Sequence, residues 1–234
     1  MERAEVAVAG LLRMHSGLWR IVGDWRWIVC PAHDSGDDVG ILCSCGLGNP
    51  EVAIQAMTTA FISSAPGRLC LFGEHQDYLG LPVIAMAMNR RCTLHFSPIQ
   101  DSRVEVASAA LGPLAEYDLN HPDEMSVELP MGMALRSMLQ EFGTPVGPGW
   151  RVWIESTIPL RAGCSSSTAL LTAWTAAWLK IFNGGFDVND VVKRCHQYEV
   201  TDYNGAGGDM DQFACAHGGI HRFGIGAPVP LHLP

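Results

Sequence analysis

The sequence predicts a two-layer α+β domain, in which a β-sheet packs against helices. Several short stretches alternate apolar and polar residues, as half-buried strands do. Other stretches repeat apolar residues at helical spacing. The strands come in clusters with helices between them, which favours α+β over other classes.

The predicted strands differ in how they are buried. The stretch at 69–73 is continuously apolar and reads as a buried strand, whereas 150–159 alternates and places Trp150, Val152 and Ile154 on one face. The full set comprises residues 69–73, 82–88, 91–97, 102–108, 150–159 and 218–224.

Three helices are predicted between and after these strands. Residues 133–143 form the first, with Gly143 as a stop signal. The longest, at 165–185, carries an apolar stripe of Leu170, Leu171, Trp174, Trp178 and Ile181. Such spacing is typical of core packing rather than of a ligand platform. The third helix, at 187–200, begins at Asp187 or Asn189 as N-cap.

Composition narrows the function classes. The 234 residues are 48% hydrophobic with a mean hydropathy of +0.13, which fits a globular protein with a substantial core. The formal net charge of −9 and 15 scattered basic residues argue against a nucleic-acid partner, because phosphate binding needs a basic face.

The sequence also predicts no membrane partner. Its most apolar helical stretch, at 169–182, falls short of the roughly 20 residues that a bilayer requires. Acidic residues precede the short apolar segment at the N-terminus, which makes it a poor signal peptide. The eight cysteines are dispersed without any C-x-x-C pair, so a reducing, cytoplasmic location is expected.

An arginine, a glutamate, a histidine and an aspartate interrupt the apolar stretch "SAPGRLCLFGEHQDYLGLP". They are Arg68, Glu74, His75 and Asp77. A strand followed by a turn with a core ion pair is one interpretation, and a small-molecule site is the other.

A second motif, "IPLRAGCSSSTALL", runs from a strand through Gly163 into three serines that open a helix. Unpaired amides at a helix start bind anions, and small residues let phosphate oxygens approach them. An ordinary serine N-cap is an equally good interpretation of this stretch alone. No Walker loop and no complete dinucleotide fingerprint occurs.

The third motif, "YEVTDYNGAGGDMDQFACAHGG", places Glu199 near a helix end. A glycine-rich loop then carries Asp209 and Asp211, and Asp209 is typical of a turn. The apolar "QFACA" indicates that the loop returns to the core at Asp211.

Together, the three motifs resemble those of the GHMP small-molecule kinases, and among them the galactokinase-like sugar kinases. "APGRLCLFGEHQDYLG" resembles the galactokinase signature, "PLRAGCSSSTA" the family's phosphate loop, and "GAGGDMDQFA" the galactokinase G-x-M-D-Q-F segment. The resemblance covers about 63–224. It implies a mixed or antiparallel sheet packed on helices, and ATP-dependent phosphorylation of a sugar's anomeric hydroxyl.

By this resemblance, Asp211 matches the aspartate that accepts the proton of that hydroxyl. Arg68 matches the arginine that pairs with this aspartate and steadies the transferring phosphoryl group. The sugar-binding residues are matched by Glu74, His75 and Asp77.

The ATP-binding loop is matched by Gly163, Ser165, Ser166 and Ser167. Ser167 and Glu199 match the residues that hold Mg²⁺. Phosphoryl transfer asks mainly for positioning and charge neutralisation, which a helix N-terminus, a metal and an arginine supply.

The chain departs from the galactokinase pattern at Leu69, Leu79 and Cys164, so another hexose or a pentose is also an expected substrate. Residues 1–62 carry no motif and are predicted to be an extension of unassigned role. Residues 225–234 are predicted to be a tail, with the family's second domain absent.

Two alternative functions remain open. One is a mevalonate-kinase-like enzyme acting on a non-sugar alcohol, although such relatives usually carry lysine in place of Arg68. The other is a non-catalytic protein that binds sugar or nucleotide.

Cys215, His217 and His221 could also hold a metal, but the glycines between the histidines favour a turn. Cys43 and Cys45 are predicted to be incidental.

Overall fold

The computed structural model describes residues 30–31, 60–183, 185–203, 208–223 and 228–231. Within these ranges one sheet contains eight strands: β1 (Cys30–Pro31), β2 (Phe61–Phe72), β3 (Val83–Ile99), β4 (Arg103–Ser108), β5 (Gly112–Asp118), β6 (Gly149–Ser156), β7 (Ile220–Phe223) and β8 (Val229–Pro230). The strand order is β1-β2-β3-β6-β4-β5, and β7 pairs with both β3 and β8. All pairs are antiparallel except β4 with β6, so the sheet is mixed.

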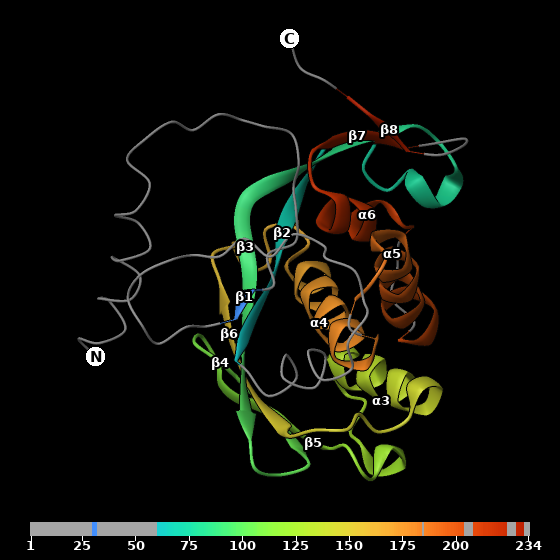
Figure 1. Ribbon diagram of the computed structural model, residues 1–234. Coiled ribbons are helices and arrows are strands. Elements are labelled where there is room, and N and C mark those ends of the chain that lie inside the picture. Colours follow the sequence, from blue (N-terminus) through green and yellow to red (C-terminus); the bar gives the residue numbers. More distant parts are fainter. Residues whose placement is uncertain (1–29, 32–59, 184, 204–207, 224–227, 232–234) are drawn as a thin grey trace, which may run out of the picture.

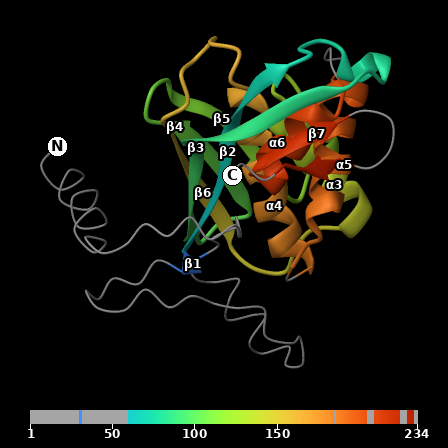
Figure 2. The ribbon, with the colours of Figure 1, turned by 90° about the horizontal axis from the view of Figure 1, so that it is seen from above.

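The helices all lie on one side of this sheet, as Figures 1 and 2 show. They are α3 (Pro130–Phe142), α4 (Ser166–Asn183), α5 (Val188–His196) and α6 (Met210–His217). A π-helical turn, η3 (Gln197–Asp202), continues α5, and two 3₁₀ turns occur at η1 (Asp77–Leu79) and η2 (Pro122–Glu124). The two-layer α+β prediction is confirmed.

Aromatic rings join the two layers. Phe96 on β3 stacks on Phe61 with ring centroids 4.7 Å apart, and it meets Trp174 and Trp178 of α4 at 6.1 and 6.4 Å. Both tryptophans are fully buried. The prediction that the apolar stripe of this helix is core is therefore confirmed for its tryptophans.

Strand β3 corrects one prediction. Residues 82–88 and 91–97 are predicted as separate strands, but they belong to a single strand of 17 residues. The intervening Asn89 and Arg90 are exposed and lie where the register between β2 and β3 shifts, opposite Gly67. A bulge admits polar residues without ending a strand, and the hydrophobic pattern therefore looks broken where the backbone is continuous.

Helix α6 corrects another. The sequence interpretation leaves Asp211 on a loop, yet the helix begins at Met210 and carries Asp211 in its first turn. Met210, Ala214 and Cys215 are buried, so the chain does return to the core at this point. The sequence did not indicate this helix, because glycines precede it and it has only eight residues, too few for a clear helical pattern.

Strand β5, which contains a glycine and a proline, is not among the strands that the sequence predicts.

The start of α5 settles an open choice. The Asp187 side chain accepts hydrogen bonds from the backbone N–H groups of Asn189 and Asp190, so Asp187 is the N-cap.

In the part of the chain that the structure describes, no helix is both long and apolar enough to cross a bilayer.

Candidate active site

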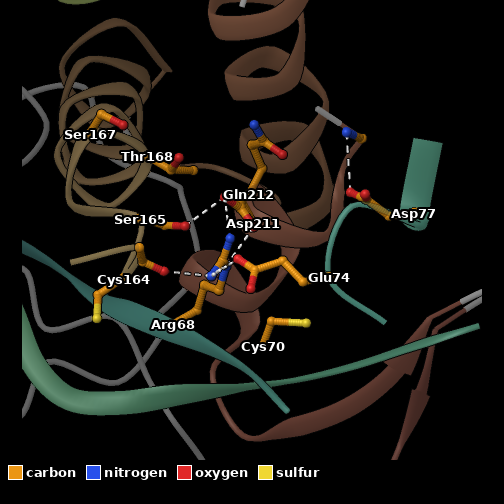
Figure 3. A network of polar contacts seen from close by, with 12 residues as sticks. Arg68, Cys70, Glu74, Asp77, Cys164, Ser165, Ser167, Thr168, Asp211 and Gln212 are labelled. Carbon is orange, nitrogen blue, oxygen red and sulfur yellow. Dashed lines mark hydrogen bonds and ion pairs between the residues drawn. The ribbon is translucent and has the colours of Figure 1, made fainter. Parts of the chain in front are cut away.

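The three motifs meet at one end of the helical layer. Arg68 comes from β2, Ser165 from the turn before α4, and Asp211 from the first turn of α6. Figure 3 shows these three side chains pointing toward one another. The predicted convergence is therefore present.

Arg68 forms a forked ion pair with Asp211. Its Nε lies 2.6 Å from Oδ1 and its Nη2 lies 3.0 Å from Oδ2, while Nη1 donates to the carbonyl oxygen of Gly163 at 2.7 Å. Arg68 is 7% exposed. Burial acts to lower the pKa of Arg68, but hydrogen bonding to Asp211 and its charge outweigh burial, and the net pKa is raised. The guanidinium stays charged beside the turn.

The turn before α4 is shaped by left-handed backbone conformations at Arg161, Gly163 and Ser165, with φ of 55°, 67° and 52°. The Ser165 carbonyl accepts the Ala169 N–H as the helix begins, while its hydroxyl donates to Asp211 Oδ2. Its hydroxyl is thus turned toward Asp211. Strained non-glycine positions of this kind concentrate at functional sites.

Gly67 lets this turn pack against β2. The Arg68 N–H donates to the Cys164 carbonyl at 3.1 Å, and a Cβ on Gly67 would lie 2.8 Å from that same oxygen and 3.2 Å from Ile158. We expect Gly67→Ala to lower the free energy of unfolding by roughly 1–3 kcal/mol, because backbone must move to admit a methyl group. Urea denaturation measures this loss.

Gly185→Ala is the matched control, since a Cβ there meets nothing within 4 Å. Its expected effect is below about 1 kcal/mol. Equal losses in the two variants would contradict the packing role of Gly67.

Glu199 is the centre of a second polar cluster, which includes Ser167 and Thr168 at the start of α4. Its carboxylate accepts hydrogen bonds from the hydroxyls of Ser167 (3.2 Å) and Thr168 (3.0 Å to each oxygen) and from Gln212 Nε2 (2.9 Å). Burial raises the pKa of Glu199, and these hydrogen bonds act in the opposite direction. Ser167 and Glu199 thus lie together; their role as metal ligands, which the family resemblance implies, stays a prediction.

The turn after β2 carries the predicted sugar-binding trio, and its members lie differently. Glu74 Oε1 is 3.8 Å from Arg68 Nη1, so it borders the ion pair. Asp77 accepts the backbone N–H of Gly208 at 3.1 Å and lies apart from the Arg68–Asp211 pair in Figure 3. His75 is exposed and has a left-handed φ of 61°. Glu74 alone of the three contacts the central pair.

Two residues of the site were missed from sequence. Thr168 and Gln212, both of which bond Glu199, are 3% and 2% exposed. The available signals were a hydroxyl directly after the three serines and an amide directly after Asp211.

His217, the last residue of α6, and His221 on β7 belong to no metal cluster among the described residues. His217 stacks on Phe213 with ring centroids 3.9 Å apart and bonds Asn189, while Gly218 and Gly219 both have positive φ. The turn interpretation fits this geometry. Cys43 and Cys45 lie outside the described residues.

Comparison with known families decides which fold this is. The family model "GHMP kinases N terminal domain" matches residues 128–219, and "Galactokinase galactose-binding signature" matches residues 54–98. This chain carries a GHMP kinase N-terminal domain. The two matched ranges include the turn before α4, Asp211 and the turn after β2.

Mevalonate kinases and galactokinases are both among the curated relatives that the chain matches. The chain is 30% identical to a mevalonate kinase of Archaeoglobus fulgidus over 69% of its own length and 52% of the relative's. It is 31% identical to a galactokinase of Ligilactobacillus salivarius over 70% of its own length and 43% of the relative's. The chain spans about half the length of the curated relatives it matches.

Solved structures agree on the fold. The galactokinase of Lactococcus lactis, complexed with galactose, matches with a TM-score of 0.63 and 26% identity, over 75% of this chain and 48% of that one. The mevalonate kinase of Methanococcus jannaschii also has a TM-score of 0.63, at 20% identity, over 73% of this chain and 55% of that one. The fold expected from the motifs is confirmed.

Proposed function

We propose that this domain takes part in ATP-dependent phosphorylation of a sugar at its anomeric hydroxyl, giving a sugar 1-phosphate and ADP. One observation carries the proposal: the Asp211 carboxylate is held between Arg68 and the serine turn, beside Glu74. The match to the galactose-binding signature supports a sugar over other alcohols.

In this proposal Asp211 accepts the proton of the attacking hydroxyl. Arg68 keeps Asp211 in place and offsets charge on the transferring phosphoryl group. Glu74, His75 and Asp77 bind sugar hydroxyls, and Asp77 does so while also holding Gly208. In this proposal, catalysis comes mainly from holding the sugar hydroxyl and the phosphoryl group in position.

The turn of Gly163, Ser165, Ser166 and Ser167 binds the phosphates of ATP, whose charge is favoured at a helix N-terminus. Mg²⁺ fits the Ser167 hydroxyl and the Glu199 carboxylate, because hard oxygen ligands lie together there. When bound, Mg²⁺ neutralises phosphate charge.

A mevalonate-type alcohol is the second candidate substrate, because mevalonate kinases match the chain as well as galactokinases do. Two departures from the galactokinase signature bear on this choice. Leu69 packs against the core, whereas Leu79 is 63% exposed on the turn after β2. Of these two residues, Leu79 is therefore the one able to change which substrate binds at the turn after β2.

A panel assay tests the proposal. The full chain is incubated with MgATP and, separately, with galactose, other hexoses, pentoses or mevalonate. ADP release is followed by a coupled assay, and the product is identified by phosphorus NMR. We expect turnover with one sugar and a phosphate on its anomeric oxygen.

Phosphorylation of mevalonate alone would replace the sugar proposal with the alternative substrate. Saturable sugar binding by calorimetry without ADP release would instead support a non-catalytic binding protein.

A further inference from the structure

Glu199 is fixed by two buried side chains from two different helices. Thr168 on α4 shares its hydroxyl proton between both carboxylate oxygens, each 3.0 Å away, and Gln212 on α6 donates to Oε2 at 2.9 Å. Both residues are at most 3% exposed. Glu199 itself sits on the π-helical turn η3, a kind of turn that occurs often at functional sites.

We propose that Thr168 and Gln212 are positioning residues that hold the Glu199 carboxylate ready for a divalent cation. This inference rests on the proposed function, in which Ser167 and Glu199 are the protein's ligands to Mg²⁺. Neither Thr168 nor Gln212 would itself touch the ion.

The division of contacts around Glu199 supports this role. An ionised carboxylate offers about four acceptor sites, and the buried side chains of Thr168 and Gln212 account for three of the contacts to Glu199. The remaining contact, from Ser167, is the longest at 3.2 Å, and Ser167 is exposed. A cation entering from that side replaces one hydrogen bond and leaves the two buried donors in place.

The orientation of the Gln212 amide also supports its positioning role. A carboxylate only accepts hydrogen bonds, so the amide NH₂ must face Glu199. The Gln212 carbonyl oxygen is then buried without a hydrogen-bond partner among the described residues. An unpaired buried carbonyl is destabilising, and a bond to a charged group offsets that loss. Gln212 is therefore oriented by Glu199 rather than by its own packing.

Gln212 also joins the two halves of the site. It follows Asp211 directly on α6, and Asp211 is bonded to Arg68 and Ser165. The amide thus ties the cation-binding carboxylate to the helix that carries the proton acceptor. A displacement of α6 would move both together.

Manganese binding provides the test. Mn²⁺ is titrated into the full chain with saturating ADP, and free Mn²⁺ is measured by electron paramagnetic resonance. We expect Thr168→Val and Gln212→Met each to weaken Mn²⁺ binding by about 10-fold or more, as loss of outer-sphere partners does elsewhere. Thr168→Ser keeps the hydroxyl and is expected to restore binding.

Thr172→Val is the matched structural control. Thr172 is fully buried on the same helix, one turn after Thr168, and its hydroxyl does not bond Glu199. Circular dichroism establishes that each variant is folded. Should Gln212→Met fail to fold, the Thr168→Val and Thr168→Ser pair decides the question alone.

The outcomes separate this inference from the proposed function. If wild-type protein binds no Mn²⁺, or if Ser167→Ala and Glu199→Gln leave binding unchanged, the proposed ligands are wrong. If those two variants lose binding while Thr168→Val and Gln212→Met match Thr172→Val, the positioning role is overturned and the ligands stand.

Discussion

Asp211→Asn is expected to lower the rate of phosphoryl transfer by about 10²–10⁴-fold, the usual contribution of a positioned general base. Asparagine keeps the shape of the side chain and can still accept from Ser165, but it cannot take up the substrate's proton. The substitution leaves in place the turn before α4, which is proposed to bind ATP, so ATP affinity should stay near that of the wild type. The rate is measured by ADP release with the sugar found in the panel assay.

Asp209→Asn is the matched control for this experiment. It makes the same chemical change two residues earlier, where the aspartate is exposed and forms no side-chain cap on α6. A comparable rate loss in both variants would mean that Asp211 acts through local charge rather than as the proton acceptor.

Arg68→Met is expected to have the largest effect on stability, a loss of about 3 kcal/mol in the free energy of unfolding, at the lower end for a broken buried ion pair. The Arg68 and Asp211 side chains are 9% and 28% exposed, so the variant leaves a largely buried carboxylate without its partner. The lower end applies because water still reaches part of Asp211. Urea denaturation at neutral pH measures the loss.

Two further variants sharpen the result. Arg151→Met breaks the exposed pair with Glu105 on the sheet and should change stability by less than about 1 kcal/mol. Combining Arg68→Met with Asp211→Leu removes both charges and should restore most of the stability lost by Arg68→Met alone. If Arg68→Met lowers the free energy of unfolding no more than Arg151→Met does, the Arg68–Asp211 pair does not stabilise the fold as predicted.

The meeting of the three motifs was predicted through their resemblance to the GHMP kinases, which implies that Arg68 pairs with Asp211. The residues alone left a core ion pair and a small-molecule site as open alternatives. The helical stripe with Trp174 and Trp178, by contrast, could be predicted from the sequence itself, since its period matches burial on one face.

What could not be predicted depends on backbone geometry that leaves little trace in the pattern. The left-handed conformation of His75 sets the turn after β2, in which Glu74 borders Arg68 and Asp77 meets Gly208. No periodicity encodes which way each side chain of such a turn points. Thr168 and Gln212 read as ordinary core-facing positions until Glu199 is seen between them.

The Arg68–Asp211 pair joins positions 143 residues apart in the chain. During synthesis on a ribosome, Arg68 emerges long before Asp211, so the ion pair forms only after α6 has been made. A nascent chain that ends before α6 therefore lacks the carboxylate that neutralises Arg68 in the folded domain.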